Sequence, residues 1–450
     1  TTLQFANSGY QINNVIHSTI LEYKALFSNR ISNKFQIGTT AYRDKRDPFS
    51  TPFPVVNVSR DGIRYIVAGH EPFSINNRLD QDVLQISNNL NFYSGDHTIT
   101  VGASFEQFQF DNSFNLGVYG GLVFAPDIAI DTLETFIKGG GLDGAVAAAQ
   151  STFDANNAND TWALAETNVG QFAAYVQDEW AVNDQLTMTF GVRIDMPLYF
   201  DTDEKIQENI DRNCCYFDFI EYFDDDGSTR MFDHTKLPDQ KPLISPRFGF
   251  NYDLTGDKTK QMRGSTGLFT GRFPFVWVGN HVANPNFFFY NYTETDFKFP
   301  QVWKTNIGYD QQINDVWGVT ADLIYQKDIN AMVVRNRGIN MPTGRLTGVD
   351  TRPVYTANDR NSFPNNAYVF DNTDEGYSFN LTLETRQNWN ESFFTSLAYN
   401  FTQSEDVSSI EAEISSDAYD RNPAFGNVNA DVLAPSIYGN RHRIVGTLYK

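Results

Sequence analysis

The sequence predicts an all-β protein, a transmembrane antiparallel β-barrel with long extracellular loops and short periplasmic turns. Three observations support this prediction. Apolar and polar residues alternate along repeated stretches, the charges of these stretches fall on the polar side, and connections are alternately short and long. This combination is typical of outer-membrane barrels, in which one face of each strand contacts lipid and the other contacts water or protein.

The hairpin predicted at 171–196 shows the alternation clearly. Apolar residues such as Phe172 and Val176 occupy every second position, whereas Glu179 and Arg193 belong to the opposite set. Because successive side chains of a strand point to opposite faces, this hairpin has one apolar and one polar face. In chain order, the predicted hairpins are 17–43 around "SNRISN", 83–105 around "YSGDH", 171–196 around "VND", 246–270 around "LTGDKTK", 301–326 around "QQIND" and 377–401 around "NWNE".

The second strand of each hairpin is followed by a long connection. These long segments are 44–78, 111–167, 200–244, 271–298, 328–375 and 404–439. Short turns on one side and long loops on the other predict that the short side is periplasmic. A soluble β-sandwich or propeller also alternates, but loops beyond about 15 residues are uncommon in compact domains. Aromatic residues at strand ends favour the membrane, where such rings sit at lipid headgroups: Trp180, Trp303, Trp317, Tyr325 and Tyr399.

The charged residues of the predicted strands share the polar face. We expect them to line the barrel lumen, because charges that face lipid are costly and charges inside a lumen can be satisfied by water and a polar plug. These lumenal candidates are Glu106, Glu179, Arg193, Asp195, Arg247, Arg263, Asp322, Glu384 and Arg386.

Composition excludes some other classes. The chain of 450 residues is 15 % aromatic and carries a net charge of −21, so its surface repels nucleic-acid phosphates and no nucleic-acid partner is expected. No run approaches the roughly 18 apolar residues of a spanning helix. The mean hydropathy of −0.41 does not argue against a barrel, because half of each spanning strand faces water or protein.

Two loop motifs have a structural interpretation and a chemical alternative. "GGGLDG" at 139–144 is interpreted as a Gly-rich break between two short helices, with Asp143 capping the second; the alternative is a nucleotide-binding loop, which would need a buried strand before it. Cys214 and Cys215 are adjacent and are interpreted as incidental loop thiols, the alternative being a vicinal or intermolecular disulfide.

Two acidic segments, 201–233 and 405–420, are predicted on the extracellular side. The residues Asp224, Asp225 and Asp226 are a weak candidate for a Ca²⁺ site, although they lack the alternating order of an EF-hand loop. A solvated, repulsive loop is the simpler interpretation. Divalent ions at these segments could bridge to lipopolysaccharide phosphates or to a partner protein. No other cofactor is expected.

The run "NPNFFFYNYTETDFKF" at 284–299 is dense in aromatic residues. It is interpreted as a girdle at a strand entrance, or alternatively as an aromatic platform for a ligand or partner. The candidates for the platform are Trp277, Phe287, Phe288, Phe289 and Tyr290. The six histidines are scattered, and neither HExxH nor GxSxG occurs, so no catalytic residue is nominated.

Two hairpins carry a family resemblance. "AAYVQDEWAVNDQLTMTFGVRID" and "ISPRFGFNYDLTGDKTKQMRGSTGLFTGRFPFVW" resemble consecutive hairpins of TonB-dependent outer-membrane receptors. The stretch that begins "YIVAGHEPFSINNRLDQDVLQISNNLNFYSGDHTITVGASFEQFQFDNSF" is similar to the Oar-like branch, whose members carry a carboxypeptidase-regulatory-like domain ahead of the plug; "GNRHRI" fits as well.

The resemblance implies a barrel of about 22 strands with a plugged lumen, located in the outer membrane of a Gram-negative bacterium. About thirteen strands are predicted here, and neither a plug nor a TonB box is recognisable. We therefore expect residues 1–450 to be a partial barrel, with the plug domain and the final strands outside this sequence. The expected partners are outer-membrane lipid and lipopolysaccharide, the protein's own plug, TonB and other outer-membrane or surface proteins.

Three functions follow from this reading. The leading one is uptake of a bulky nutrient, such as an iron chelate, glycan or peptide, by plug-gated active transport. Acidic loops would repel an anionic ferric siderophore, which favours neutral or cationic ligands or a protein partner. The alternative is a structural or secretion-associated subunit whose extracellular loops dock partner proteins, since Oar-like members are connected with protein export. An enzyme is the third and least favoured.

Overall fold

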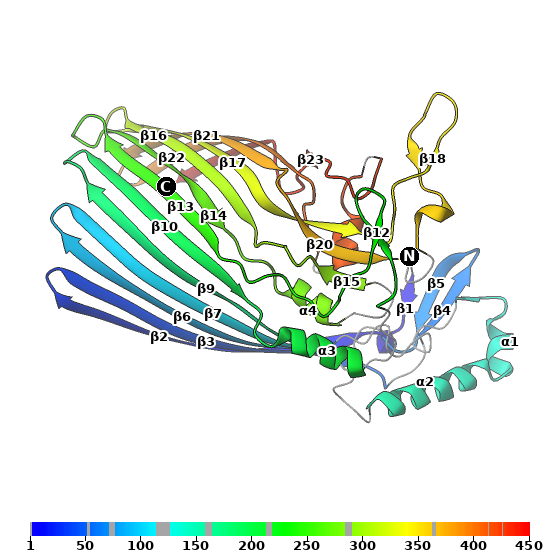
Figure 1. Cartoon of the computed structure of the whole chain (residues 1–450). Helices are drawn as coiled ribbons and strands as arrows, with labels where there is room; N and C mark the ends of the chain where they lie inside the picture. Colours follow the sequence, from blue (N-terminus) through cyan, green and yellow to red (C-terminus); the bar gives the residue numbers. More distant parts are fainter. Residues whose placement is uncertain are drawn as a thin grey trace.

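One large curved antiparallel sheet dominates the structure, a computed structural model that describes residues 2–51, 55–71, 77–113, 127–157, 164–212, 218–283, 290–361, 366–412, 414–424 and 426–450 (Figure 1). Its thirteen long strands are β2 (Tyr10–Ser28), β3 (Ile31–Pro48), β6 (Arg78–Ser94), β7 (His97–Ser113), β9 (Leu164–Ala181), β10 (Leu186–Leu198), β13 (Leu243–Asp253), β14 (Lys260–Thr270), β16 (Gln301–Gln312), β17 (Trp317–Asn336), β21 (Tyr377–Asn390), β22 (Phe393–Asp406) and β24 (His442–Tyr449). Short turns lie at one end of the sheet, and the long connections gather at the other. The predicted fold class is confirmed.

All six predicted hairpins form, and each long strand pairs with its neighbours in the order of the chain. In the hairpin of β9 and β10, Val176 lies opposite Val192, and Trp180 lies opposite Met188. Several strands are longer than predicted. β17 continues to Asn336, well beyond the 9–11 residues that a tilted strand needs to cross a bilayer. The last residues of β17 therefore project from the membrane. Among the described residues, β2 pairs only with β3 and β24 only with β22, so the sheet does not close.

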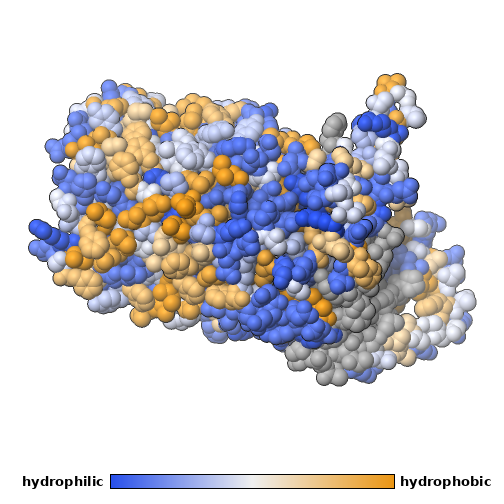
Figure 2. Space-filling model, in the orientation of Figure 1, coloured by the Kyte–Doolittle hydropathy of each residue, from blue (hydrophilic) through white to orange (hydrophobic). Residues whose placement is uncertain are grey.

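The two faces of the sheet differ in exposure. Large apolar side chains such as Ile194, Ile307 and Leu383 are 40–47 % exposed on the outer face. Figure 2 shows apolar residues spread over the strands and polar residues gathered toward the long connections. An exposed apolar band of this kind is unfavourable in water and suits contact with lipid. The part of the chain that the structure describes contains no helix long and apolar enough to cross a membrane.

Two glycines make room for side chains that cross the inner face. Arg263 on β14, Gly308 on β16 and Asp322 on β17 are in register, and Arg263 reaches over Gly308 to Asp322. A Cβ on Gly308 would lie 2.6 Å from both Arg263 Nη1 and Asp322 Oδ1. Gly102 on β7 similarly lets Tyr175 reach Asn89 on β6, where its hydroxyl donates to Asn89 Oδ1 at 2.5 Å. The alternating pattern thus includes gaps that permit contacts across two strands.

The segments outside the long strands contain short elements of their own. One small sheet consists of β1 (Leu3–Gln4), β4 (Val56–Arg60), β5 (Ile63–Ala68) and β8 (Ile128–Ala129). The helices are α1 (Leu133–Lys138), α2 (Gly141–Asn157), α3 (Thr202–Arg212), α4 (Val276–Ala283) and α5 (Ser415–Asp420). The remaining short strands are the pairs β11 (Tyr222–Phe223) with β12 (Thr229–Arg230), β18 (Gly344–Arg345) with β19 (Pro353–Val354), and β15 (Tyr290–Thr293) with β20 (Ala367–Thr373), together with β23 (Ala434–Pro435). β15 is parallel to β20, and β20 extends the projecting end of β17.

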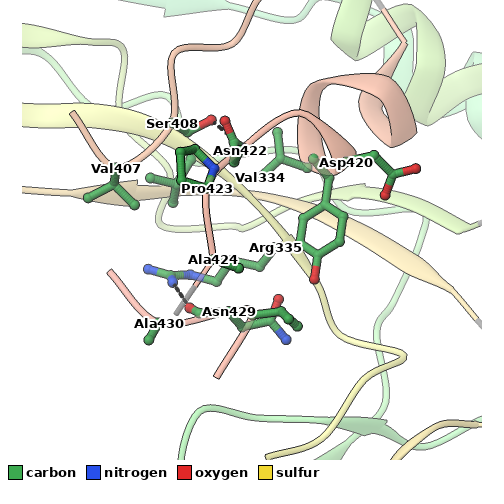
Figure 3. A pocket seen from close by; sticks show the side chains of 13 residues that line it. Val334, Arg335, Val407, Ser408, Asp420, Asn422, Pro423, Ala424, Asn429 and Ala430 are labelled. Atoms are coloured by element: carbon green, nitrogen blue, oxygen red, sulfur yellow. Dashed lines mark hydrogen bonds between the residues drawn. The ribbon is translucent and has the colours of Figure 1, made fainter. Parts of the chain in front are cut away.

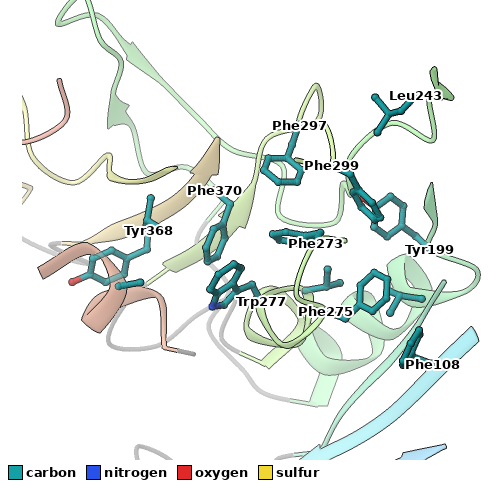
Figure 4. Packing of buried hydrophobic residues seen from close by; sticks show 14 residues of the cluster. Phe108, Tyr199, Leu243, Phe273, Phe275, Trp277, Phe297, Phe299, Tyr368 and Phe370 are labelled. Carbon is teal, nitrogen blue, oxygen red and sulfur yellow. The ribbon is translucent and has the colours of Figure 1, made fainter. Parts of the chain in front are cut away.

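We call the connections that follow β10, β14, β17 and β22 the cap. They share a hydrophobic core in which Phe273, Phe275 and Trp277, around the start of α4, are almost completely buried (Figure 4). Phe275 contacts Phe108 of β7, with ring centroids 5.3 Å apart, and Trp277 stacks on Phe370 of β20 at 5.1 Å. Rings from the sheet and from different connections therefore form one core, which gives the cap a defined structure.

Gly139 and Gly140 of the Gly-rich motif at 139–144 separate α1 from α2, so the predicted break between two helices is confirmed. The prediction that Asp143 caps the second helix is wrong. Gly140 has a positive φ of 76°, the second helix begins at Gly141, and Asp143 therefore lies in the first helical turn, where a carboxylate still interacts favourably with the helix dipole. The predictions for Cys214, Cys215, Phe287, Phe288 and Phe289 lie outside the described residues.

Candidate functional site: the lumenal wall and the cap

The nine charged candidates on the strands lie on one face of the sheet. Directly opposed residues of an antiparallel pair share a face, and the register connects Glu106 to Gln171, Arg193 to Ser245, and Asp322 to Thr382. When the register is followed from strand to strand in this way, the same face also carries Glu179, Asp195, Arg247, Arg263, Glu384 and Arg386. This face is opposite to the exposed apolar band. We call it the lumenal wall.

An ion pair shows that the lumenal wall is the concave face. Arg272, two residues after β14, pairs with Glu106 on β7, although β9, β10 and β13 lie between these strands in the sheet. A side chain can bridge such strands only across the inside of the curve. The guanidinium of Arg272 also lies 4.9 Å from the ring centroid of Phe108, and Gln85 donates to Glu106 at 3.0 Å. The wall and the cap are therefore joined at this point.

Most of these charges have partners on the wall itself. Arg263 Nε lies 2.9 Å from Asp310, and Arg263 Nη1 lies 2.8 Å from Asp322. Arg386 pairs with Glu384 at 2.8 Å. Such pairs remove much of the cost of placing charges on an inner surface. Glu179 is exposed near the turn of its hairpin.

A polar cavity of about 290 Å³ lies where the wall meets the cap. Asp195, which is 1 % exposed, accepts hydrogen bonds from Gln171 at 2.7 Å and from Arg193 at 2.9 Å. The opposite side of the cavity consists of Glu106 and Arg272. Two arginines and two carboxylates thus balance each other at the upper edge of the lumen.

The aromatic candidates of the cap that the structure describes are buried. Trp277 and Tyr290 are each 4 % exposed. Trp277 belongs to the core around Phe273, and Tyr290 contacts Tyr222 and Phe232. Neither side chain offers a surface in this arrangement. Their role as a ligand platform stays a prediction, and it would require the cap to open.

The acidic motif of the cap is bound by arginine. Both guanidinium nitrogens of Arg337 contact the carboxylate of Asp225, and Arg337 Nη1 lies 3.8 Å from Asp224. Burial raises the pKa of Asp225, but the hydrogen bond from Arg337 and the charges of Arg337, Arg335 and Arg230 together hold this pKa below its usual value. Asp226 accepts from Ser228. No group of three or more metal-binding side chains occurs in the described residues, and the Ca²⁺ site stays a prediction.

A second arginine connects the end of β17 to the connection after β22. Arg335 Nη1 lies 2.7 Å from Asp431 and donates to the carbonyl of Asn429 at 2.5 Å, at the edge of a cavity of about 180 Å³ (Figure 3). The side-chain amide of Asn429 donates to the carbonyls of Asn336 and Ile339 at 2.9 and 3.1 Å. These contacts fix residues 426–431 against the end of β17.

Sequence reasoning missed the arginines that stabilise the cap. Arg335 and Arg337 follow the predicted strand at 301–326, within a segment treated as a loop. The available signal was the spacing of the two arginines in "VVRNRG", because two charges two residues apart share a face if the strand continues through them. Their acidic partners come from three other segments and could not be assigned from spacing.

The sequence matches a known family model described as "Outer membrane beta barrel domain" over residues 1–295. No curated protein sequence matches it. Among solved structures, the outer membrane transporter YddB from Escherichia coli is similar with a TM-score of 0.55 and 10 % identity, over 99 % of this chain and 50 % of that one.

Two further solved structures are similar with lower scores. The copper transporter OprC gives a TM-score of 0.49 and 9 % identity, over 88 % of this chain and 48 % of that one. The ferric-catecholate import receptor Fiu from E. coli K12 gives 0.47 and 13 %, over 89 % and 49 %. The chain spans about half the length of the solved structures it matches. With the family model covering most of its length and a curved antiparallel sheet that carries apolar residues outside and paired charges inside, the chain belongs to the outer-membrane β-barrel domain family.

Proposed function

We propose that this chain forms part of the barrel of a TonB-dependent, Oar-like outer-membrane receptor that imports a bulky nutrient, such as an iron chelate, glycan or peptide, by plug-gated transport. The observation that carries the proposal is the lumenal wall. Its charges follow the inside of the sheet from β7 to β21, and most of them are compensated in pairs. A lumen that holds a polar domain needs this kind of wall, whereas a small barrel is filled by its own side chains.

The open sheet supports a larger barrel. Thirteen strands leave β2 and β24 with one unpaired edge each among the described residues, and open edges do not occur within the hydrocarbon region. A barrel of about 22 strands would supply the missing pairing and enclose a plug. In this proposal the nine charged residues of the lumenal wall contact the plug, and TonB acts on the plug from the periplasm. Lipid and lipopolysaccharide surround the outer face.

The charges of the cap influence which class of ligand the receptor binds. Asp224 and Asp225 belong to the acidic segment at 201–233, but both are within 4 Å of Arg337, so their charges are partly neutralised. Repulsion of an anionic ligand is therefore weaker there than the sequence alone suggests. The polar cavity between Glu106 and Asp195 is balanced in charge, which favours a neutral ligand with many hydrogen-bonding groups over a strongly charged one.

One feature favours the alternative, a subunit whose loops dock partner proteins. The hairpin of β18 and β19 projects from the cap (Figure 1). Its tip exposes Leu346 and Val349, and Arg345 is exposed beside them. An apolar tip on a basic stem is a plausible contact for an acidic protein surface in a chain of otherwise negative charge.

The test is to isolate the full-length protein from native membranes without disrupting its complexes and to determine its structure and bound molecules. We expect a plug inside the barrel and a small ligand between plug and cap, identified by mass spectrometry of the extracted sample. A stoichiometric protein that covers the cap, without any ligand above the plug, would overturn the importer and support the docking subunit.

A further inference from the structure

The six histidines fall into two groups. His17, His97 and His442 lie on membrane strands; His17 and His442 are exposed, and His97 is half-buried. His70, His234 and His281 lie in the long connections and are 0 % exposed. Full burial is uncommon for a residue that gains a charge just below neutral pH, because an imidazolium without water must find new partners. Two of the buried histidines, His234 and His281, contact each other.

His234 and His281 hold two segments of the cap together. Nε2 of His234 lies 2.6 Å from the carbonyl oxygen of His281, and Nε2 of His281 lies 2.7 Å from the carbonyl oxygen of His234. A carbonyl oxygen can only accept, so Nε2 of each ring carries a hydrogen in this arrangement. The reciprocal bonds fasten the segment 218–242 to α4. The ring centroids are 4.4 Å apart.

The ring contacts of this histidine pair among the described residues are with aromatic side chains. The titratable groups of β15 that face it are phenols: Tyr290 stands edge-on to His234 at 4.5 Å, and Tyr292 lies 5.3 Å from His281. On the segment 218–242, Arg230 pairs with Glu294 at the end of β15. On α3, which packs against α4, Asn209 donates to the carbonyl of Val282.

Two charged residues of α3 have partners other than the histidines. Lys205 of α3 lies within 3.3 Å of Glu166 and Glu208, and Arg212 donates to the carbonyl of Leu164. On β9, the neighbour of α4 is the neutral Thr167, whose Oγ1 would lie 3.8 Å from a Cβ on Gly279. The contacts of the histidine pair described above are thus with aromatic and neutral groups.

Protonation acts against this arrangement. Burial, together with the neighbouring His281, lowers the pKa of His234 well below its usual value, and burial lowers the pKa of His281 to about 4. A proton on His281 would add an N–H at Nδ1, which has no hydrogen-bond partner among the described residues. Two imidazolium rings at this distance would also repel each other.

We propose that His234 and His281 make the cap a proton-sensitive gate: acidification breaks their reciprocal bonds, separates the segment 218–242 from α4 and opens the mouth of the barrel. As a regulation of transport, this inference rests on the proposed function. α4 carries Trp277 and follows Arg272, so its release exposes the aromatic core and loosens the Arg272–Glu106 pair between cap and wall. The buried candidates Trp277 and Tyr290 become accessible to a ligand only in the open state.

The direction and the size of the pH effect on cap opening follow from the difference in histidine pKa between the closed and the open state. Both histidines prefer the neutral form in the closed cap, so the closed state is most stable above the ordinary histidine pKa of about 6.5 and loses stability as the pH falls below it. An open state with ordinary histidines and a closed state that stays neutral give an increase in the opening equilibrium of about 25-fold per histidine between pH 7 and pH 5. The pair together gives several hundredfold.

The experiment measures hydrogen–deuterium exchange of the full-length receptor in lipid vesicles at pH 7, 6 and 5, corrected for the intrinsic pH dependence of exchange. We expect protection of 218–242 and 276–283 to fall together by a few hundredfold between pH 7 and pH 5, while the strands β9 and β10 keep theirs. In His234→Gln/His281→Gln the glutamine amides can still donate to the same carbonyls but cannot titrate. This variant should lose the pH response.

The matched controls are His97→Gln and His442→Gln, which remove histidines on membrane strands and should leave the response of the cap unchanged. If the double glutamine variant does not fold, NMR of isotopically labelled histidines in the unmodified receptor decides the question. Equal protection at pH 7 and pH 5, or a pKa near 6.5 for both buried histidines in a closed cap, overturns the inference. The proposed function fails separately, if the cap opens in acid while no TonB-dependent ligand is found.

Discussion

The charges of the lumenal wall and those of the cap are compensated in different ways. On the wall, Arg263 meets Asp310 and Asp322, which are on the next two strands of the sheet. In the cap, Arg337 meets Asp225, which lies more than a hundred positions earlier in the chain. The partners on the wall follow from strand order, whereas those in the cap follow only from the way the connections fold over each other. Local order therefore determines the wall, and long-range packing determines the cap.

This difference predicts how each region responds to substitution. A residue of the wall has neighbours fixed by a ladder of backbone hydrogen bonds, so a change there should act locally. A residue of the cap core joins several connections at once, so a change there should affect all of them. The predictions below test this contrast, from the largest expected effect to the smallest.

Arg337→Ala should destabilise the cap most. Its side chain is 3 % exposed and contacts Asp225 and Asp371, whose side chains are 58 % and 25 % exposed. Removing one partner of a buried ion pair costs about 3–5 kcal/mol; because both carboxylates keep contact with water, we expect a cost near the lower end, about 3 kcal/mol. We expect faster proteolysis and hydrogen exchange throughout the cap of the full-length protein, with the strands unaffected.

The control for this variant is Arg352→Ala. Arg352 is 68 % exposed and pairs only with its neighbour Asp350 in the projecting hairpin of β18 and β19. Exposed pairs of this kind contribute about 0–1 kcal/mol, so exchange in the rest of the cap should not change. If both variants behave alike, Arg337 does not organise the cap.

Sequence alone predicted the wall well and the cap poorly, for a physical reason. A strand repeats every two residues, so the positions of Ile307 and Asp322 on opposite faces follow from counting. Trp277 and Phe370 are in contact but lie in different connections, and no repeating pattern of the sequence relates residues so far apart. Spacing showed that Trp277 belongs to an aromatic-rich segment, but not that its neighbours would bury it. The same holds for His234 and His281, which are unremarkable in the sequence.

Ile307→Arg tests the outer face of the wall. Ile307 is in the middle of β16 and is 40 % exposed in the apolar band. An arginine that faces lipid near the middle of the membrane costs about 2–4 kcal/mol. The measurement is the free energy of unfolding of the full-length barrel in vesicles. Asn306→Arg, one position earlier and on the lumenal wall, should cost markedly less; equal costs would contradict the assignment of the faces.

Gly308→Ala tests the crossing of Arg263 over β16. The added methyl group would meet Arg263 and Asp322 at 2.6 Å, so the ion pair between them must shift. Overpacking of this kind costs about 1–3 kcal/mol. Gly249→Ala is the control, because the nearest atom to a Cβ there is 3.5 Å away. A barrel that tolerates both substitutions equally would show that the crossing adds nothing to stability.

The smallest effect is expected at an ion pair that joins the two regions. Glu106 belongs to the wall and Arg272 to the cap, and their side chains are 24 % and 44 % exposed. A double-mutant cycle with Glu106→Gln and Arg272→Ala should give a coupling energy of about 1 kcal/mol in the exchange of α4, near the upper end for pairs that retain contact with water. If the cap were held only by its own core, the cycle would show no coupling. If instead the coupling reached that of a buried pair, about 3 kcal/mol or more, the wall and the cap would form a single cooperative unit, and the contrast between them would disappear.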